Sequence, residues 1–498
     1  MAAGAIKLLG FDFGASSGRG MLGEYDGGKL ALSELHRFGN DPVRMGAHLR
    51  WDFPRLFHEL KAGMIKAVRA GSGDAASIGV NTWGVDFGLL DEYGELISNP
   101  FHYRDALTGD AMARLRALVP DRELYSRTGI QFMKFNTIYQ LFALKHLYPA
   151  IYEMARKLLL MPDLFGYFLT GEITAEYSMA STTAMLDVFK RDWDIELLGM
   201  AGFDPGMLPA PVMPGTPLGG LLPQVAEETG MHGAKVISVC GHDTASAVLA
   251  TPLRRDRPGA YLSCGTWSLL GVELDEPLTH GGAFAAQYTN EGGFGGTIRF
   301  LKNIMGQWMM NEIKRDYERV HGPISFAKIN EMELNAQPFG PLVDVDAPEF
   351  AQPGHMAEKV GAFCSRTGQK SPDGLGALMR CVDESIALSY RSNIDALEAV
   401  IGYKLPELRV VGGGIQNINL MQMAACALER PVYAGPAEAT AAGNIMAQLY
   451  ALGEISDAWE ARQIVENSFT AAVYEPDAAA ASGWRGALGY YKECIKGK

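Results

Sequence analysis

Ile6-Lys-Leu-Leu-Gly-Phe-Asp12, followed by Phe13-Gly-Ala-Ser-Ser-Gly-Arg19, is the stretch that decides the fold. The first segment is an apolar run that predicts a buried strand, and the second is a turn rich in glycine and hydroxyl side chains. A second short strand at 20–25, a turn at 26–28 and a third strand at 30–38 complete a meander. This segment therefore predicts a strand that ends in a turn of the size that holds a phosphate.

The same succession of elements recurs in the second half of the chain. Residues 259–263 predict a strand, 264–267 a tight turn and 268–274 a return strand. Apolar strands at 76–80 and 408–411 also match, because each runs into a polar or glycine-rich turn. These two turns are Asn81-Thr-Trp-Gly-Val-Asp86 and Gly412-Gly-Gly-Ile-Gln-Asn417. Such internal similarity predicts two related lobes.

Two lobes of this kind predict an α/β fold with strand-end turns around a central cleft, where α/β proteins bind ligands. We expect domains at 1–247 and 248–498, since charged and turn-forming residues gather at 247–258. Apolar residues spaced by three and four predict helices at 54–70, 138–147 and 377–400.

The composition limits the classes of partner. With 48% apolar and 20% charged residues among 498, the chain is typical of a soluble protein of two or three domains. A net charge of -13 without a basic block argues against a nucleic-acid partner. No apolar run approaches the roughly 18 residues of a membrane span, and residues 1–10 lack the features of a signal peptide. We therefore expect a cytoplasmic protein without a membrane partner, whose oligomeric state the sequence leaves open.

The turn at 12–19 is the first candidate phosphate site. Its glycines let the backbone approach an anion, and the hydroxyls of Ser16 and Ser17 can donate to phosphate oxygens. Arg19 can add a charge-assisted contact, and Asp12 could orient waters on Mg²⁺. A plain hairpin and an Asx-turn at Asp12 explain the same residues. The chain has no P-loop, dinucleotide or protein-kinase signature, so hairpin-type turns would have to hold any nucleotide.

Two further turns could contact a nucleotide. Cys264-Gly-Thr266 offers the hydroxyl and amide of Thr266 as donors. Gly412-Gly-Gly414 offers a flat backbone surface on which an adenine or ribose could lie, although a tight turn would look the same.

Gly241-His-Asp-Thr-Ala-Ser246 contains the candidate base, Asp243. It follows an apolar strand at 234–240, so the carboxylate would lie at a strand end near the lobe junction. A kinase for a hydroxyl acceptor needs a carboxylate within hydrogen-bond reach of that hydroxyl. A helix cap at Asp243 and a packed His242 are the plain alternatives. The order of acid-plus-glycine turn, junction aspartate, Gly-Thr turn and glycine triplet favours the chemical interpretation.

These motifs resemble the FGGY carbohydrate kinases of the actin-like ATPase superfamily over nearly the whole chain. The motifs that carry the resemblance are Asp12-Phe-Gly-Ala-Ser-Ser-Gly-Arg, Asn81-Thr-Trp-Gly-Val-Asp-Phe, Tyr103-Arg-Asp, Thr128-Gly-Ile-Gln-Phe, Phe135-Asn-Thr-Ile-Tyr-Gln-Leu, Leu160-Met-Pro-Asp-Leu-Phe, Gly241-His-Asp-Thr-Ala-Ser-Ala-Val, Leu262-Ser-Cys-Gly-Thr-Trp-Ser-Leu, Asn290-Glu-Gly-Gly, Leu301-Lys-Asn-Ile-Met-Gly, Val411-Gly-Gly-Gly-Ile-Gln-Asn and Gly435-Pro-Ala-Glu-Ala-Thr. Residues 83–87 and 301–306 are the most specific of these, since they are typical of family members that act on L-rhamnulose.

The resemblance implies two ribonuclease-H-like lobes, with the sugar and the phosphate turn at 1–247 and the nucleotide at 248–498. It implies that ATP, with Mg²⁺ as cofactor, gives its γ-phosphate to the 1-hydroxyl of L-rhamnulose in L-rhamnose catabolism, with Asp243 as general base. By position, it implies ketose contacts from Gly84, His242, Thr244 and Asn303. It implies ATP contacts from Ala15, Ser16, Ser17, Gly18, Arg19, Thr266, Asn311 and Gly413, and a metal contact from Asp12 through water. At Asn311 the related kinases carry Gln, which is longer by a methylene.

Three alternatives stay open at this point. The acceptor could be a related ketose such as L-fuculose or L-xylulose, and the scaffold could be a catalytically silent sugar sensor. A cytoskeletal or chaperone-type ATPase of the same superfamily would hydrolyse ATP without a sugar. Cys364 and Cys381 match positions that form a disulfide in related enzymes, whereas a reducing cytosol argues against the bridge.

Overall fold

The computed structural model describes residues 5–265 and 267–497, which divide into two compact units. The first unit contains the chain up to Ala250 together with Glu273–Phe300 and Ala439–Ser468. The second contains Thr251–Val272, Leu301–Glu438 and the segment from Phe469 onward. The α/β fold with two lobes is therefore confirmed, whereas the exact division at 247/248 stays a prediction.

A six-stranded mixed sheet forms the centre of the first unit, in the order β13-β14-β6-β1-β2-β3. β14, β6 and β1 lie side by side and parallel, and β2 and β3 continue as an antiparallel meander. The strands are β1 (Ile6–Phe13), β2 (Ser17–Tyr25), β3 (Leu30–Gly39), β6 (Ser77–Thr82), β13 (Thr216–Gly220) and β14 (Lys235–Ser238). The meander expected at the start of the chain is confirmed.

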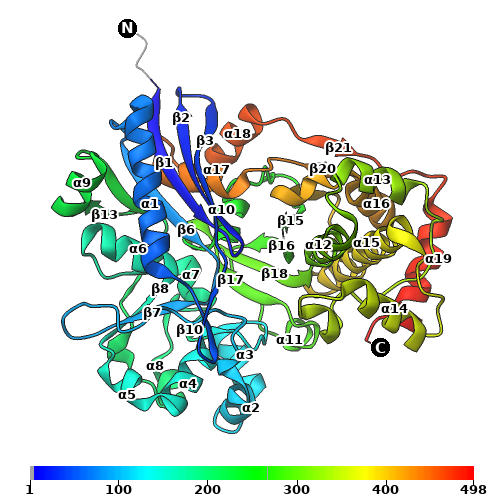
Figure 1. Cartoon of the computed structure of the whole chain (residues 1–498), viewed down its shortest axis with the longest axis horizontal. Coiled ribbons are helices and arrows are strands. Elements are labelled where there is room, and N and C mark those ends of the chain that lie inside the picture. The colour runs from blue at the N-terminus through cyan, green and yellow to red at the C-terminus, as the bar shows by residue number, and fades with distance from the viewer. Residues whose placement is uncertain (1–4, 266, 498) are drawn as a thin grey trace. The chain divides into compact units, whose positions relative to one another are not determined.

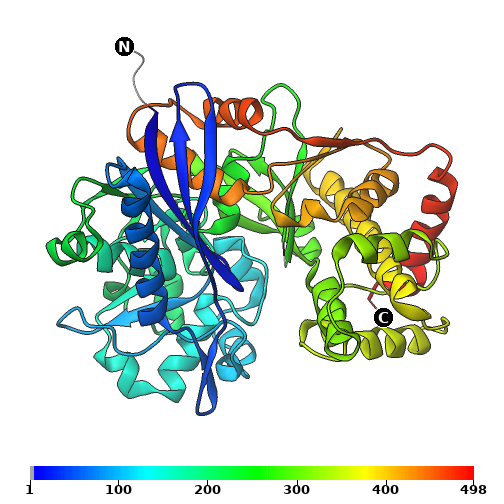
Figure 2. The ribbon, with the colours of Figure 1, turned by 45° about the horizontal axis from the view of Figure 1, so that its top comes forward.

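Helices cover both faces of this sheet. α1 (Phe53–Ala67) packs against β2 and β3, and Figures 1 and 2 show it along one face. α17 (Ala439–Ala451) packs against β1 and β6. Gly10 and Phe11 are neighbours on β1 and so point to opposite faces: Gly10 faces Asn444 of α17, and Phe11 faces α1.

α10 (Asp243–Leu249) is the short helix that carries the candidate base, and it packs directly on α17. The close approach depends on Gly443, because a Cβ there would overlap the carbonyl group of Ser246. The helix that positions Asp243 is thus held against the helix that covers the sheet.

The other elements of the first unit form a mainly helical layer and several short strand pairs. Its core is a separate apolar cluster that includes Leu141, Phe142 and Leu197. The helices of this layer are α2 (Ala111–Arg116), α3 (Asp121–Thr128), α4 (Thr137–Leu147), α5 (Pro149–Met154), α7 (Tyr177–Ser181), α8 (Ile195–Ala201) and α11 (Gly281–Ala286). By contrast, α6 (Met161–Thr170) packs on β6 and β14, α9 (Pro223–Thr229) on α1, and α18 (Ala458–Ser468) on β3 and α17. The strand pairs are β4 (Val43–Met45) with β5 (His48–Arg50), β7 (Phe87–Leu90) with β8 (Lys157–Leu160), β9 (Ala175–Glu176) with β12 (Pro211–Val212), and β10 (Leu186–Asp187) with β11 (Asp192–Trp193). β17 (Thr289–Gly292) pairs instead with β18 (Ile298–Met305).

The second unit repeats the strand pattern of the first. β15 pairs with β16 as an antiparallel hairpin and with β19 in parallel, and β20 lies parallel beyond β19. The strands are β15 (Ala260–Cys264), β16 (Trp267–Leu274), β18 (Ile298–Met305), β19 (Leu408–Val411), β20 (Val432–Ala434) and β21 (Ala472–Tyr474). The start of β18, up to Phe300 and therefore including Arg299, belongs to the first unit. The order β18-β16-β15-β19-β20 matches β3-β2-β1-β6-β14, so the internal repetition expected from the sequence is confirmed.

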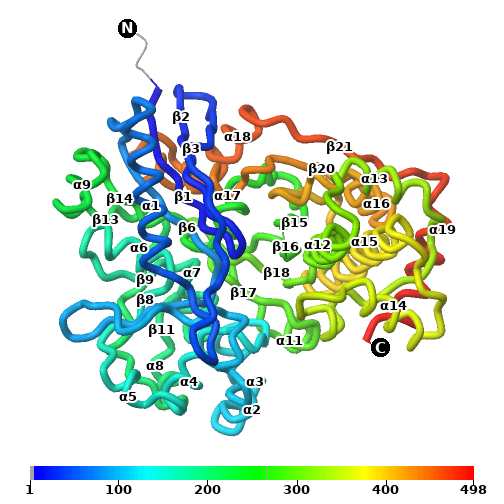
Figure 3. The backbone as a smooth tube through the Cα atoms, in the orientation of Figure 1, coloured from blue at the N-terminus to red at the C-terminus, as the bar shows by residue number. Residues whose placement is uncertain are grey.

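A long central helix, α15 (Gly374–Ile401), organises the rest of the second unit. It contacts α12 (Trp308–His321), α13 (Phe326–Leu334), α16 (Ile418–Leu428) and α19 (Ala481–Tyr490), and α14 (Met356–Arg366) packs on α12. Figure 3 traces these helices around α15.

The expected helices agree with the structure to within a few residues. The segments 54–70, 138–147 and 377–400 correspond to α1, α4 and α15. None of the helices in the described ranges combines the length and apolar character needed to cross a membrane.

Candidate functional site

Three strand ends meet at one edge of the first unit's sheet. β14, β6 and β1 are parallel neighbours, so the segments that follow them leave the sheet at the same edge. β1 leads into the phosphate turn, β6 into the segment with Gly84, and β14 toward Asp243. Thr82 donates its amide proton to the carbonyl oxygen of Gly241 (2.8 Å), which joins the last two segments. Local sequence signals and sheet topology together therefore gather the candidate residues of this unit.

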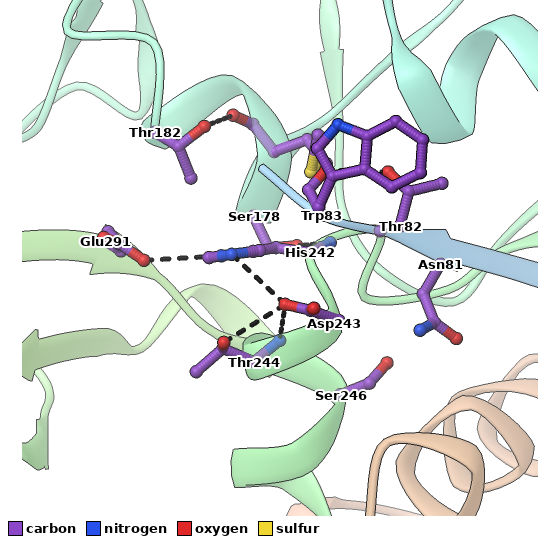
Figure 4. A network of polar contacts seen from close by, with 12 residues as sticks. Asn81, Thr82, Trp83, Ser178, Thr182, His242, Asp243, Thr244, Ser246 and Glu291 are labelled. Atoms are coloured by element: carbon purple, nitrogen blue, oxygen red, sulfur yellow. Dashed lines mark hydrogen bonds and ion pairs between the residues drawn. The ribbon is translucent and has the colours of Figure 1, made fainter. Parts of the chain in front are cut away.

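Asp243 begins α10 and presents its two carboxylate oxygens to different surroundings. Oδ1 accepts hydrogen bonds from the amide (2.6 Å) and the hydroxyl (3.2 Å) of Thr244 and lies 3.3 Å from Nε2 of His242. Figure 4 shows these contacts converging on one oxygen. Within the described part of the chain, no hydrogen bond reaches Oδ2, and the side chain is 31% exposed. Oδ1 thus accepts two hydrogen bonds from Thr244 and faces His242, whereas Oδ2 remains available to a ligand.

The segment that precedes Asp243 is held by a buried carboxylate. Glu176 accepts from the amide of Gly241 (2.9 Å) and from the hydroxyl of Ser178 (2.6 Å). A Cβ at Gly241 would lie 2.9 Å from the same carboxylate oxygen, so only glycine fits there. Burial raises the pKa of Glu176, although its hydrogen-bond donors act in the opposite direction. The backbone before the candidate base is therefore fixed by packing and by hydrogen bonds.

His242 lies directly behind Asp243 and is buried, with 8% of its surface exposed. Its Nδ1 lies 3.1 Å from Nη2 of Arg299 and 3.4 Å from Oε2 of Glu291. Arg299 and Glu291 pair with each other at 3.1 Å, and Arg299 also donates from Nε to the carbonyl oxygen of Gly292 (2.8 Å). Burial acts to raise the pKa of Glu291, but the neighbouring Arg299 and His242 outweigh it and lower that pKa. These contacts form a continuous line of polar groups from Glu291 to Asp243.

Gly84 lies next to the imidazole of His242. A Cβ at Gly84 would come within 3.2 Å of Nε2, so a larger side chain would crowd the ring. The next residue, Val85, has a φ of 67°, a conformation that is rare for a β-branched residue. Backbone strain at a non-glycine residue often marks a functional turn.

Asp86 anchors this strained turn from inside the protein. It is completely buried, and its Oδ2 accepts from the indole nitrogens of Trp51 (2.6 Å) and Trp83 (2.9 Å), while Oδ1 accepts from Nε2 of Gln140 (2.8 Å). The backbone amide of Tyr103 adds a fourth donor (3.1 Å). Burial raises the pKa of Asp86 to about 7, and the four donors oppose that rise.

The phosphate turn keeps an exposed tip between two paired strands. Gly14 donates its amide proton to the carbonyl oxygen of Ser17 (2.9 Å), and Ser16 between them is exposed. Asp12 lies just before the turn, 3.6 Å from the guanidinium of Arg19 across the hairpin. Asn81 donates to Asp12 Oδ1 (3.0 Å), so the carboxylate has a fixed position at the strand end.

The glycine triplet of the second unit packs against the end of β15. A Cβ at Gly412 or at Gly414 would lie 2.8 Å from the carbonyl oxygen of Cys264, so neither position tolerates a side chain. Gly413 between them faces open space. Gln307 donates to the carbonyl oxygen of Gly414 (2.8 Å) from the start of α12.

The other predicted residues have more scattered positions. Asn311 is exposed on α12, one turn after Gln307, and so lies on the helix that contacts the glycine triplet. Asn303 is half-buried on β18 of the second unit. Thr266 lies outside the described residues. Cys364 and Cys381 are both free thiols.

Sequence reasoning missed the side chains that hold the predicted ones in place. These are Asp86, Glu176, Glu291, Arg299 and Gln307. Asp86 and Glu291 stand inside motifs that the sequence singles out, and that is the one signal that could have found them. Nothing local distinguishes Arg299, because its partner is 57 positions away along the chain.

Comparison with known proteins gives consistent matches over nearly the whole chain. The models of the N-terminal and C-terminal domains of the FGGY family of carbohydrate kinases match residues 7–250 and 260–452. The rhamnulokinase of Halalkalibacterium halodurans is 41% identical over 461 residues, which are 93% of this chain and 97% of that protein. The rhamnulokinase of Bacteroides thetaiotaomicron is 39% identical over 490 residues, covering 98% and 99%.

Solved structures show the same fold at much lower identity. A gluconate kinase from Lactobacillus acidophilus superposes with a TM-score of 0.82 at 17% identity, covering 98% of this chain and 97% of that one. Glycerol kinase from Plasmodium falciparum, solved with ADP, has a TM-score of 0.79 at 13% identity, and 99% of each chain is covered.

Proposed function

This chain belongs to the FGGY family of carbohydrate kinases, and from that membership we propose that it phosphorylates the 1-hydroxyl of L-rhamnulose with ATP in L-rhamnose catabolism. Relatives that share 37–41% of their residues with it over almost their full length are rhamnulokinases. The substrates are then two small molecules, a ketose and ATP, and we expect the protein to bind both in the cytoplasm.

The asymmetric carboxylate of Asp243 is the observation that carries the proposal. Oδ1 is occupied by Thr244 and His242, so Oδ2 is the atom that would take the proton of the attacking hydroxyl. In phosphoryl transfer, such a base orients the acceptor and receives its proton as the new phosphorus–oxygen bond forms. Asp243 is accordingly our candidate for the general base.

Residues near Asp243 would hold the ketose. Gly84 leaves room beside the imidazole of His242, and Thr244 is fixed by its own bond to Asp243. We assign ketose contacts to these three residues and to Asn303 of the second unit. These contacts would place the 1-hydroxyl of the ketose next to the base and keep the other hydroxyls away from it, so that only the 1-position is phosphorylated.

The turns would hold ATP. In the first unit we assign phosphate contacts to the hairpin residues Ala15, Ser16, Ser17, Gly18 and Arg19, of which Ser16 at the tip is exposed and Gly18 is buried against Phe38. In the second unit we assign nucleotide contacts to Thr266, Asn311 and Gly413. The open space at Gly413 supports this, because a planar base or a ribose can lie on bare backbone.

The residues at the first strand end suit Mg²⁺ bound with ATP. When bound, Mg²⁺ neutralises charge on the phosphoryl group that is transferred. Asp12 is a single fixed carboxylate, and the described ranges contain no group of three or more His, Cys, Asp or Glu that could hold a metal. That sparse donor set fits an ion that keeps several waters and takes phosphate oxygens. Asp12 would therefore contact it through water.

A coupled assay of ADP formation over a panel of ketoses tests the proposal. We expect L-rhamnulose to give the highest kcat/KM, L-fuculose and L-xylulose much lower values, and EDTA to abolish turnover. A preference for another ketose would change the proposed substrate but would still support a sugar kinase. ATP hydrolysis indifferent to sugar, or no turnover at all, would contradict the proposed function.

A further inference from the structure

Behind Asp243, buried polar contacts run from Glu291 through Arg299 to His242. Which of these groups can donate a hydrogen bond and which can accept one determines where the ring proton of His242 lies. Arg299 carries only N–H groups and cannot accept a hydrogen bond. Its Nη2 lies 3.1 Å from Nδ1 of His242, so Nδ1 has to present its lone pair to the guanidinium. The ring proton of a neutral His242 then resides on Nε2.

The other ring nitrogen of His242 points at the candidate base. Nε2 lies 3.3 Å from Oδ1 of Asp243, so an N–H there faces a carboxylate oxygen at ion-pair distance. The opposite tautomer would place an N–H at Nδ1 against the N–H of Arg299 and a lone pair at Nε2 against a carboxylate. Both contacts would be repulsive. An N–H at Nδ1 could still be accepted by Oε2 of Glu291, but at the longer distance of 3.4 Å, so the two closer contacts favour the Nε2–H tautomer.

Glu291 keeps the guanidinium of Arg299 in this position. Its Oε2 pairs with Nη2 at 3.1 Å and lies farther from Nδ1 of His242, at 3.4 Å. Arg299 is completely buried, and its Nε is also fixed by the carbonyl oxygen of Gly292. A buried guanidinium held at two points has little freedom to turn away from the ring.

We propose that Arg299 is a positioning residue that fixes the Nε2–H tautomer of His242 and so keeps Oδ2 of Asp243 turned toward the acceptor hydroxyl. Glu291 acts one step further back by holding Arg299. The catalytic consequence rests on the proposed role of Asp243, whereas the tautomer rests on the contacts of His242 with Arg299 and Asp243. Neither Arg299 nor Glu291 would touch substrate.

NMR of the full-length protein labelled with ¹⁵N-histidine tests the tautomer without reference to activity. We expect His242 to show a pyridine-type Nδ1 and a protonated, pyrrole-type Nε2; the signal is assigned by its loss in His242→Gln. A protonated Nδ1 with an unprotonated Nε2 in the wild-type protein would overturn the proposal. This result does not require any variant of Arg299 to fold.

Variants then test the consequence for turnover. In Arg299→Met we expect the preference for Nε2–H to be lost and kcat to fall about 10- to 100-fold, with the KM for ATP within about twofold, as for a perturbed general base. Arg299→Lys keeps a donor and is expected to recover much of both the tautomer and kcat. Arg191→Met is the matched control, because Arg191 donates to the carbonyl oxygens of Gly296 and Asp275 instead.

The outcomes separate this inference from the proposed function. If Arg299→Met folds and keeps both the Nε2–H tautomer and wild-type kcat, Arg299 has no positioning role. A fall in kcat equalled by Arg191→Met would mean that loss of packing is responsible. If Asp243→Asn retains turnover, the general base assignment fails, whatever tautomer His242 adopts.

Discussion

The two units share one strand order but end their strands in different chemistry. At the edge of the first sheet the turns present side chains: Asp243, His242 and Asp12 are each fixed by hydrogen bonds or ion pairs. At the corresponding edge of the second unit, the segment after β19 presents bare backbone, with Gly412 and Gly414 pressed against β15. The repeated fold thus supplies an equivalent set of strand ends in each unit. The residues there differ, so the first unit presents charged side chains and the second presents bare backbone.

The comparison predicts that chemistry depends on the first unit, and Asp243→Asn tests this most strongly. The amide keeps the size of the carboxylate but cannot accept the hydroxyl proton, so we expect kcat to fall by about 100- to 10,000-fold. The KM for ATP should change little, since the nucleotide contacts lie elsewhere. Steady-state kinetics with L-rhamnulose measure both constants. Turnover close to wild type would contradict the assignment of the chemistry to the strand ends of the first unit.

The charge buried in the first unit also predicts a pH response. The pKa of Asp86 is about 7 in the folded protein against 3.8 as the ordinary value, so between these pH values the folded state holds a proton that the unfolded chain has released. Stability from this group is complete below about pH 4 and is lost as the pH rises through 7. Asp86→Asn should therefore flatten the fall in unfolding free energy between pH 4 and 7, measured by urea denaturation.

Asp26→Asn is the matched control for this pH effect. Asp26 is an exposed carboxylate in the β2–β3 turn, and the amides of Lys29 and Gly28 lower its pKa. Its stabilising contribution is lost only as the pH falls through that lowered value, so the variant should keep the wild-type slope between pH 4 and 7. Equal slopes in wild type and Asp86→Asn would show that Asp86 keeps its charge in the folded state.

The backbone surface of the second unit can be tested by single methyl groups. In Gly414→Ala the new Cβ would lie 2.8 Å from the carbonyl oxygen of Cys264, and overpacking of this kind costs about 1–3 kcal/mol. We expect a lower Tm and a higher KM for ATP. Gly413→Ala meets no atom within 4 Å and should keep the wild-type Tm, although its methyl group could still obstruct the nucleotide. A Tm equally low in both variants would contradict the packing argument.

How much the sequence predicts depends on whether the signal is local. The strand and turn at 6–19 were predictable because apolar residues, glycines and hydroxyls occur in one short run, and the hairpin that forms there needs no distant partner. The repeated strand order followed from the same local patterns. Arg299 could not be predicted, since its role arises only when β18 brings it next to His242. Asp86 stands in a conspicuous motif, but its donor Trp51 comes from 35 positions earlier.

Arg19→Ala removes one charge from the phosphate hairpin of the first unit and should have the smallest effect. The Arg19 side chain is 24% exposed and its guanidinium lies 3.6 Å from Asp12, so its contact with a phosphate would be screened by solvent. We expect the KM for ATP to rise about three- to tenfold, near 1 kcal/mol, while kcat and the KM for the ketose stay within about twofold. Lys29→Ala is the matched loss of charge at the opposite edge of the same sheet, in the β2–β3 turn, and should leave the KM for ATP unchanged. A rise confined to the KM for the ketose would instead indicate that the hairpin tip binds the sugar and not ATP. It would contradict the phosphate contacts proposed for the first unit.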